Sequence, residues 1–157
     1  MLLARQIHLV VLAAVAALLL TGVAAAGPSQ REASLLAAVN GVRKAHDLRS
    51  LAVDPRLMRV ARSHSATMLR RDVLTHGDFG SRMRRSGARG PRFGENLAWG
   101  SGRYGTARSI VQSWLRSPGH RANLLRPGFR RIGIGARVGT FAGYRGAVVV
   151  TADFAGT

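Results

Sequence analysis

The sequence predicts an α+β domain in which helices precede a sheet. Residues 31–116 hold three stretches whose apolar side chains recur at helical spacing. Residues 131–138 alternate as a strand does, and residues 147–154 are rich in valine, so these two segments predict neighbouring strands. Helices and strands that are segregated along a chain are typical of layered α+β domains.

The first 26 residues predict an export signal rather than part of that domain. Arg5 gives a positive start, Leu9–Leu20 is an unbroken apolar run, and Ala24–Ala26 offers small residues for cleavage. An uncleaved membrane anchor is the alternative, because Ile7–Ala26 is just long enough to span a bilayer. Cleavage is the preferred interpretation. The expected organisation is a signal peptide, a short linker and one domain: 1–26, 27–31 and 32–157.

The mature chain is expected to be secreted, free of disulfides and without a transmembrane span. Removing 26 of the 157 residues leaves 131. A domain of this size buries roughly two-thirds of the surface of its unfolded chain, which is enough for one core. The chain has no cysteine, which excludes disulfides, thiolate metal sites and cysteine nucleophiles.

The chain is strongly basic, with 24 Lys and Arg against 7 Asp and Glu and a net charge of +17. Loss of Arg5 with the signal leaves 23 basic against 7 acidic residues, or +16. Such a charge attracts polyanions, which outside a cell include teichoic acids, anionic lipid head groups and acidic polysaccharides. Compositional bias without any partner is the alternative. Nucleic acid is not the expected partner, because the basic residues are scattered and the signal directs the chain out of the cell.

Three helices are predicted from apolar spacing and from the residues that begin and end them. The first covers residues 31–46, and the second covers residues 55–71 after Asp54, an N-cap residue followed by proline. The third covers residues 105–116 and stops at a Ser-Pro-Gly run. His64 lies on the apolar stripe of the second helix. A core histidine bonded to a neighbour is preferred there over a ligand.

Between the second and third helices, residues 74–93 are expected to be irregular. A loop of this length is usually functional or mobile, and five arginines from Arg82 to Arg92 give it the strongest local positive field of the chain. A solvated loop without a partner is the alternative. After the third helix, a single turn at 120–125 is expected to lead into an antiparallel hairpin of the two C-terminal strands.

Three motifs, in this order and spacing, resemble one known family. They are Gly-Glu-Asn-Leu-Ala-Trp-Gly at 94–100, Trp114 with Ser-Pro-Gly-His-Arg-Ala-Asn-Leu-Leu at 117–125, and Gly-Ile-Gly at 133–135 before Val-Val-Thr-Ala-Asp-Phe at 149–154. Together they are similar to the CAP superfamily of cysteine-rich secretory proteins, plant pathogenesis-related proteins and bacterial secreted relatives. The resemblance covers about residues 32–156, and the Ser-Pro-Gly-His-Arg-Ala-Asn form is similar to the bacterial branch.

The resemblance implies an αβα sandwich with a central antiparallel sheet. It also implies a large cleft in which two histidines and two acidic residues can bind a divalent metal, often zinc. His76 in Leu-Thr-His and His120 in Gly-His correspond to the two histidines, and Glu95 in Gly-Glu-Asn corresponds to one acid. The other acid follows the tryptophan of the third helix in eukaryotic members. This chain has none there, and its nearest polar side chains are Gln112 and Ser117.

Two imidazoles and one carboxylate suit zinc and leave a position for a water that could attack a carbonyl. A zinc-dependent hydrolase acting on peptide or envelope polymer is therefore one hypothesis, although the ligands His76, Glu95 and His120 are dispersed and no second carboxylate is evident as a base. Alternatively, Glu95 pairs with His76 or His120 and holds the loop without binding anything. A serine hydrolase is not expected, because no Gly-x-Ser-x-Gly elbow is present.

The favoured function is a non-catalytic extracellular module that binds a lipid, a glycan or another envelope component in this cleft. The candidate cleft residues are His76, Glu95, His120, Ser117 and Trp99, of which the first three are the candidate metal ligands. Trp99, expected in a loop beside Glu95, is a candidate platform, although a core role is preferred for both tryptophans. No catalytic residue is assigned and enzyme status stays open, because a fold alone does not imply a reaction.

Overall fold

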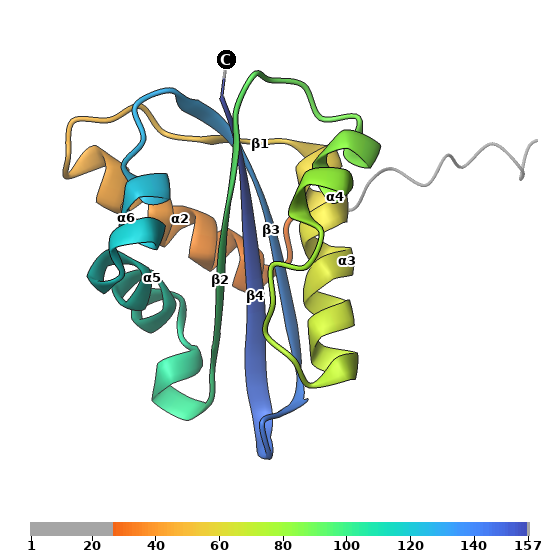
Figure 1. Cartoon of the computed structure of the whole chain (residues 1–157). Coiled ribbons are helices and arrows are strands. Elements are labelled where there is room, and N and C mark those ends of the chain that lie inside the picture. Colours follow the sequence, from red (N-terminus) through yellow and green to blue (C-terminus); the bar gives the residue numbers. More distant parts are fainter. Residues whose placement is uncertain (1–26, 157) are drawn as a thin grey trace, which may run out of the picture.

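The computed structural model describes residues 27–156, which form one sheet between two layers of helices (Figure 1). One face of the sheet is covered by three helices: α2 (Gln30–Lys44), α5 (Ala107–Arg116) and α6 (Pro118–Leu124). The other face is covered by two: α3 (Pro55–Arg71) and α4 (Phe79–Ser86). This arrangement confirms the αβα sandwich. The predicted signal peptide lies outside the described residues.

The sheet has the strand order β1-β3-β4-β2. The C-terminal strands β3 (Phe129–Phe141) and β4 (Tyr144–Gly156) form the predicted antiparallel hairpin, and β4 also pairs antiparallel with β2 (Phe93–Gly100). The two residues of β1 (Ala52–Val53) pair parallel with β3. The expected antiparallel sheet is therefore present in β3, β4 and β2, and the two-residue β1 adds a parallel pairing at the other edge.

The predicted helices agree with the structure because their ends carry real caps. Asp54 accepts hydrogen bonds from the backbone N–H groups of Arg56 and Leu57 at 2.8 and 3.3 Å and starts α3 at the predicted residue. At α2, the Ser29 hydroxyl accepts from the Glu32 N–H at 3.3 Å while the Glu32 carboxylate accepts from the Ser29 N–H, which completes a capping box. The third predicted helix, 105–116, is α5, which begins two residues later than predicted and follows a 3₁₀ turn, η2 (Gly102–Gly105).

Three segments differ from the prediction. Part of the expected loop forms α4, which Asp78 caps by accepting from the Ser81 N–H at 3.0 Å. Only Met83 and Ser86 of this arginine-rich helix are buried, too few to show a period in the sequence. Residues 94–98 were expected in a loop but lie in β2, where all of them are buried and no alternation is visible. The single turn expected at 120–125 is the helix α6.

Two glycines let α3 lie directly on β3. A Cβ at Gly133 would lie 2.1 Å from the backbone carbon of Leu57, and one at Gly135 would lie 2.3 Å from that of Ala61. The Ser65 hydroxyl donates to the Gly135 carbonyl at 2.9 Å and ties the same turn of the helix to the strand. This close approach places the middle of α3 against the sheet.

The larger buried cluster lies between the sheet and α2, α5 and α6. Trp114 is 1% exposed within it and donates its indole N–H to the carbonyl of Leu97 at 2.9 Å, which confirms its core role. Arg43 of α2 is also fully buried and donates to the carbonyls of Leu124 and Phe129 at 2.8 and 3.2 Å. Within residues 27–156, no helix has the length and apolar character needed to cross a membrane.

Candidate functional site

The site is centred on Glu95, a buried carboxylate on the edge strand β2. His76, in the loop before α4, places its Nδ1 2.7 Å from Oε1 of Glu95. Since an ionised carboxylate can only accept, Nδ1 of His76 carries the proton. The guanidinium of Arg82 donates to the other oxygen, Oε2. Both carboxylate oxygens of Glu95 therefore have a protein partner.

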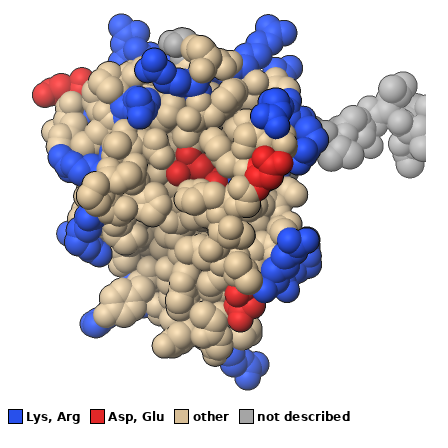
Figure 2. All heavy atoms as spheres, viewed as in Figure 1, with Lys and Arg blue, Asp and Glu red and all other residues tan. Residues whose placement is uncertain are grey.

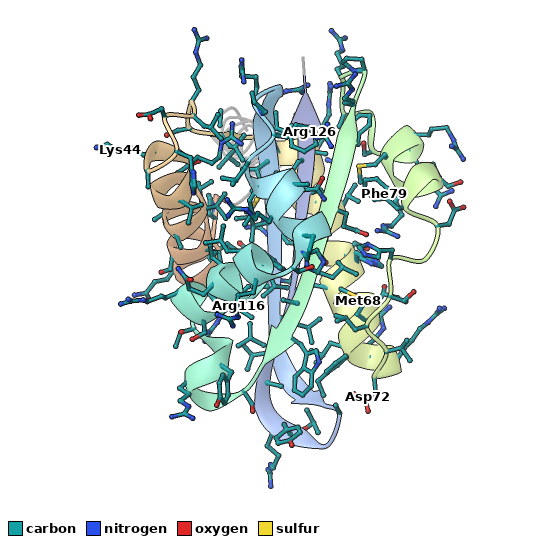
Figure 3. All side chains as sticks on the ribbon, turned by 60° about the vertical axis from the view of Figure 1, so that its left-hand side comes forward. Lys44, Met68, Asp72, Phe79, Arg116 and Arg126 are labelled. Atoms are coloured by element: carbon teal, nitrogen blue, oxygen red, sulfur yellow. The ribbon has the colours of Figure 1, made fainter. Side chains whose placement is uncertain are left out.

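Arg82 reaches this carboxylate from α4. Its second terminal nitrogen donates to the backbone carbonyl of His76, and its guanidinium lies 5.7 Å from the ring centroid of Phe79, one turn earlier. The side chain of Arg82 is only 16% exposed. Figure 3 shows Phe79 of α4 on the same side of β2 as Met68 of α3, away from Arg116 of α5. Arg82 thus joins α4, the His76 loop and β2.

Asp153 lies opposite Glu95 in the register between β4 and β2. It is fully buried, and neither of its carboxyl oxygens has a hydrogen-bond donor among the described residues. Burial, and next the charge of Glu95, raise the pKa of Asp153 well above its ordinary value, while the charge of Arg82 acts in the opposite direction. The folded protein therefore favours the protonated form of Asp153.

Two further histidines lie close to this centre. His64 of α3 is 7% exposed, donates from Nε2 to the carbonyl of Thr75 at 2.8 Å and lies 3.9 Å from Oε2 of Glu95. These contacts match its interpretation as a core histidine. Burial and the charge of Arg82 lower its pKa. His120 of α6 is half-buried, and burial, followed by the charge of His76, lowers its pKa.

The other two candidate residues lie elsewhere in the structure. Ser117 begins α6 and makes no side-chain cap bond. Trp99 lies in a strand, and its ring packs 5.3 Å from that of Phe141 and 5.6 Å from that of Tyr144. Within residues 27–156, no hydrogen bond or ion pair joins Ser117 or Trp99 to Glu95. The structure therefore pairs His76 with Glu95, and it leaves Trp99 in an aromatic group near the hairpin turn. His120 lies on α6, where its backbone carbonyl accepts from the Asn96 amide at 3.0 Å.

Sequence reasoning missed Arg82 and gave no weight to Asp153. Arg82 is one of five arginines in a short segment, and only the helical path of α4 and its packing against α3 turn it inward. Asp153 had a visible signal, because it is the one acid in the otherwise largely apolar predicted strand 147–154. Its pairing with Glu95 needs the register of β2 and β4, which the sequence does not give.

The arrangement at Glu95 does not fit a metal ion. Among residues 27–156, no three His, Cys, Asp or Glu side chains are placed to hold one. His76 and Arg82 already bind the two oxygens of Glu95, and a guanidinium at that position repels a further cation. Zinc binding was predicted from the family resemblance, and a titration of the protein with zinc would test it.

A pocket of about 380 Å³ opens between α3 and α4, beside this cluster. It is lined by three arginines, three hydroxyl residues and two others: Arg59, Arg82, Arg85, Ser63, Thr67, Ser86, His64 and Val60. No acidic residue belongs to this described lining. On the face drawn in Figure 2, acidic atoms are visible near the centre, while Lys and Arg lie mostly around the border. We call the cavity the arginine pocket.

Comparison with known proteins identifies the family. The model of the cysteine-rich secretory protein family, CAP, matches residues 36–154. This chain belongs to the CAP family. It is 32% identical over 112 residues to the uncharacterized protein YkwD of Bacillus subtilis (strain 168), an alignment that covers 68% of this chain and 42% of YkwD.

Two solved structures share the CAP fold with this chain. An extracellular protein containing an SCP domain from Bacillus anthracis str. Ames has a TM-score of 0.65 and 26% identity, over 84% of this chain and 45% of that one. An outer surface protein from Borrelia burgdorferi has a TM-score of 0.65 and 21% identity, over 84% of this chain and 97% of that one. The chain thus spans less than half of YkwD and of the Bacillus anthracis protein.

Proposed function

We propose that this CAP chain is a non-catalytic extracellular module that binds a lipid, glycan or other component of the cell envelope beside His76, Glu95 and His120. Its solved bacterial relatives include an extracellular protein and an outer surface protein. The export signal expected at residues 1–26 supports the same compartment. We prefer binding to catalysis because of the contacts of Glu95 and the burial of Asp153.

The carboxyl groups of the site are engaged in structure. A carboxylate that acts as a general base must be free to reach its substrate, whereas Glu95 accepts from His76 and Arg82 with its two oxygens. Asp153, beside Glu95 on β4, is 0% exposed and out of reach of a ligand in the cleft. The alternative, a zinc-dependent hydrolase, needs the same oxygens of Glu95 for a metal.

The arginine pocket is the observation that carries the choice of ligand. Guanidinium groups bind phosphate with two parallel hydrogen bonds. Arg59 and Arg85 are exposed at the pocket, and the half-buried Arg82 also belongs to its lining. A cavity of about 380 Å³ is within the range of natural ligand sites. The bound component therefore carries phosphate, as a teichoic acid or an anionic lipid head group does.

The test is equilibrium binding of the purified protein to poly(glycerol phosphate) and to phosphatidylglycerol vesicles. Two double variants each remove two positive charges: Arg59→Gln with Arg85→Gln in the pocket, and the exposed Arg71→Gln with Arg145→Gln outside it. Since charge-assisted hydrogen bonds are lost only in the first, its affinity should fall about tenfold or more, and that of the second less than about threefold. Equal losses would reduce the effect to net charge, and no binding of either probe would contradict the proposal.

A further inference from the structure

We propose that Arg82 is the resident cation of the cleft. Its guanidinium takes the place beside Glu95 where a divalent metal ion would bind, so the wild-type cleft holds its shape and its ligand without a metal. This inference goes beyond the proposed function, because an anionic ligand could fail to bind while Arg82 still excludes metals.

The contacts of Arg82 are those of a fixed counter-ion. It donates to Oε2 of Glu95 and to the carbonyl of His76, and it packs on the ring of Phe79 at 5.7 Å. By contrast, Arg84 and Arg85 on the same helix are exposed, and Arg84 bonds only to the Ser81 hydroxyl one turn earlier. A buried carboxylate needs a partner of opposite charge, and Arg82 supplies it from within the chain.

The charge balance of the cleft agrees with this role. The resemblance to CAP proteins implies two acids around a divalent ion, and this chain lacks the second acid after Trp114. Glu95 is the carboxylate that the described cleft presents, since Asp153, its register partner on β4, is fully buried. One guanidinium neutralises one carboxylate. A divalent ion added to this pair would leave an excess of buried positive charge, which a low-dielectric site disfavours strongly.

Isothermal titration of the protein, free of affinity tags, with Zn²⁺ and with Mn²⁺ tests the inference. Wild type and the matched control Arg84→Gln, which removes a charge from the exposed face of α4, should show no stoichiometric binding. Arg82→Gln frees Oε2 of Glu95 and removes the repulsion, so it should bind one ion at least about 100-fold more tightly than wild type. Adding Glu95→Gln to Arg82→Gln should abolish that binding.

Two results of the titration overturn the inference. One is stoichiometric binding by wild type that Glu95→Gln abolishes. The other is a folded Arg82→Gln that binds no ion, because the place beside Glu95 is then not a metal position. If Arg82→Gln does not fold, Arg82→Lys and wild type decide: both should bind no ion, and the Tm of wild type should be the same with EDTA and with Zn²⁺. A Tm that falls with EDTA would show a resident metal and overturn the inference.

Discussion

Replacing Asp153 by Asn should stabilise the protein at neutral pH, although the residue is fully buried in the sheet. Asp153 has no donor for either carboxyl oxygen among the described residues, and it faces Glu95 across the strand pair. Asparagine has nearly the same volume and no charge, and its amide N–H can donate to Glu95 as a protonated carboxyl does. The variant therefore keeps the shape of the site. It also removes the free-energy cost of keeping Asp153 protonated in the folded protein at neutral pH.

The sign of the pH dependence follows from the raised pKa of Asp153. Below its ordinary pKa of about 3.9, the group is protonated in the folded and the unfolded chain and costs nothing. Between that pH and its higher folded pKa, the folded chain binds more protons, so wild-type stability falls as the pH rises. One pKa unit corresponds to about 1.4 kcal/mol, so a pKa raised well above the ordinary value makes the expected gain of Asp153→Asn at pH 7 at least about 1 kcal/mol.

Urea unfolding of wild type and Asp153→Asn at pH 4 and at pH 7 measures this gain. At pH 7 the variant should be more stable by the amount above, with a Tm higher by about 4 °C for each kcal/mol. At pH 4 the difference should be nearly zero. A variant that is less stable than wild type by the same amount at both pH values would show that Asp153 is ionised and paired. That result would contradict the raised pKa of Asp153.

Two further substitutions test the packing that positions the site. Arg43→Met should cost about 3–5 kcal/mol in denaturant unfolding, because the carbonyls of Leu124 and Phe129 lose a buried donor; a loss below about 1 kcal/mol would contradict this. Gly135→Ala should cost about 1–3 kcal/mol or more, because its Cβ meets the backbone of α3, whereas Gly119→Ala, which faces open space, should stay within about 0.5 kcal/mol of wild type. Equal effects of the two glycine substitutions would argue against the close contact of α3 and β3.

The sequence predicted those parts of the fold whose signals are local. The Asp-Pro start at Asp54 and the apolar stripe after it define α3, and the valine-rich run predicts β4, because caps and periodicity act over a few residues. The strand β2 was missed, because consecutive buried residues that include Glu95 and Asn96 show no alternation. Polar residues are tolerated there because Asn96 bonds to the backbone of α6 and Glu95 bonds to His76 and Arg82.

The candidate site was predicted in part. The pairing of Glu95 with His76 was one of the alternatives that the sequence allowed, and their 2.7 Å contact confirms it. Arg82 and Asp153 could not be placed, because their roles depend on the docking of α4 and on the register of β2 with β4. Both are long-range properties of the fold. The sequence predicted zinc ligands at His76, Glu95 and His120. The structure adds Arg82 and Asp153 beside Glu95, and these two contacts depend on the tertiary fold.

The most direct test of the account is an NMR titration of the ¹⁵N-labelled protein with glycerol 1-phosphate. We expect saturable shifts of the backbone amides of residues that line the arginine pocket, including Ser63 and Thr67 on α3 and Ser86 on α4. Arg59→Gln with Arg85→Gln should weaken these shifts, and Arg71→Gln with Arg145→Gln should leave them. Shifts spread evenly over the basic surface, or no shift in the pocket at saturating phosphate, would contradict a phosphate-binding module.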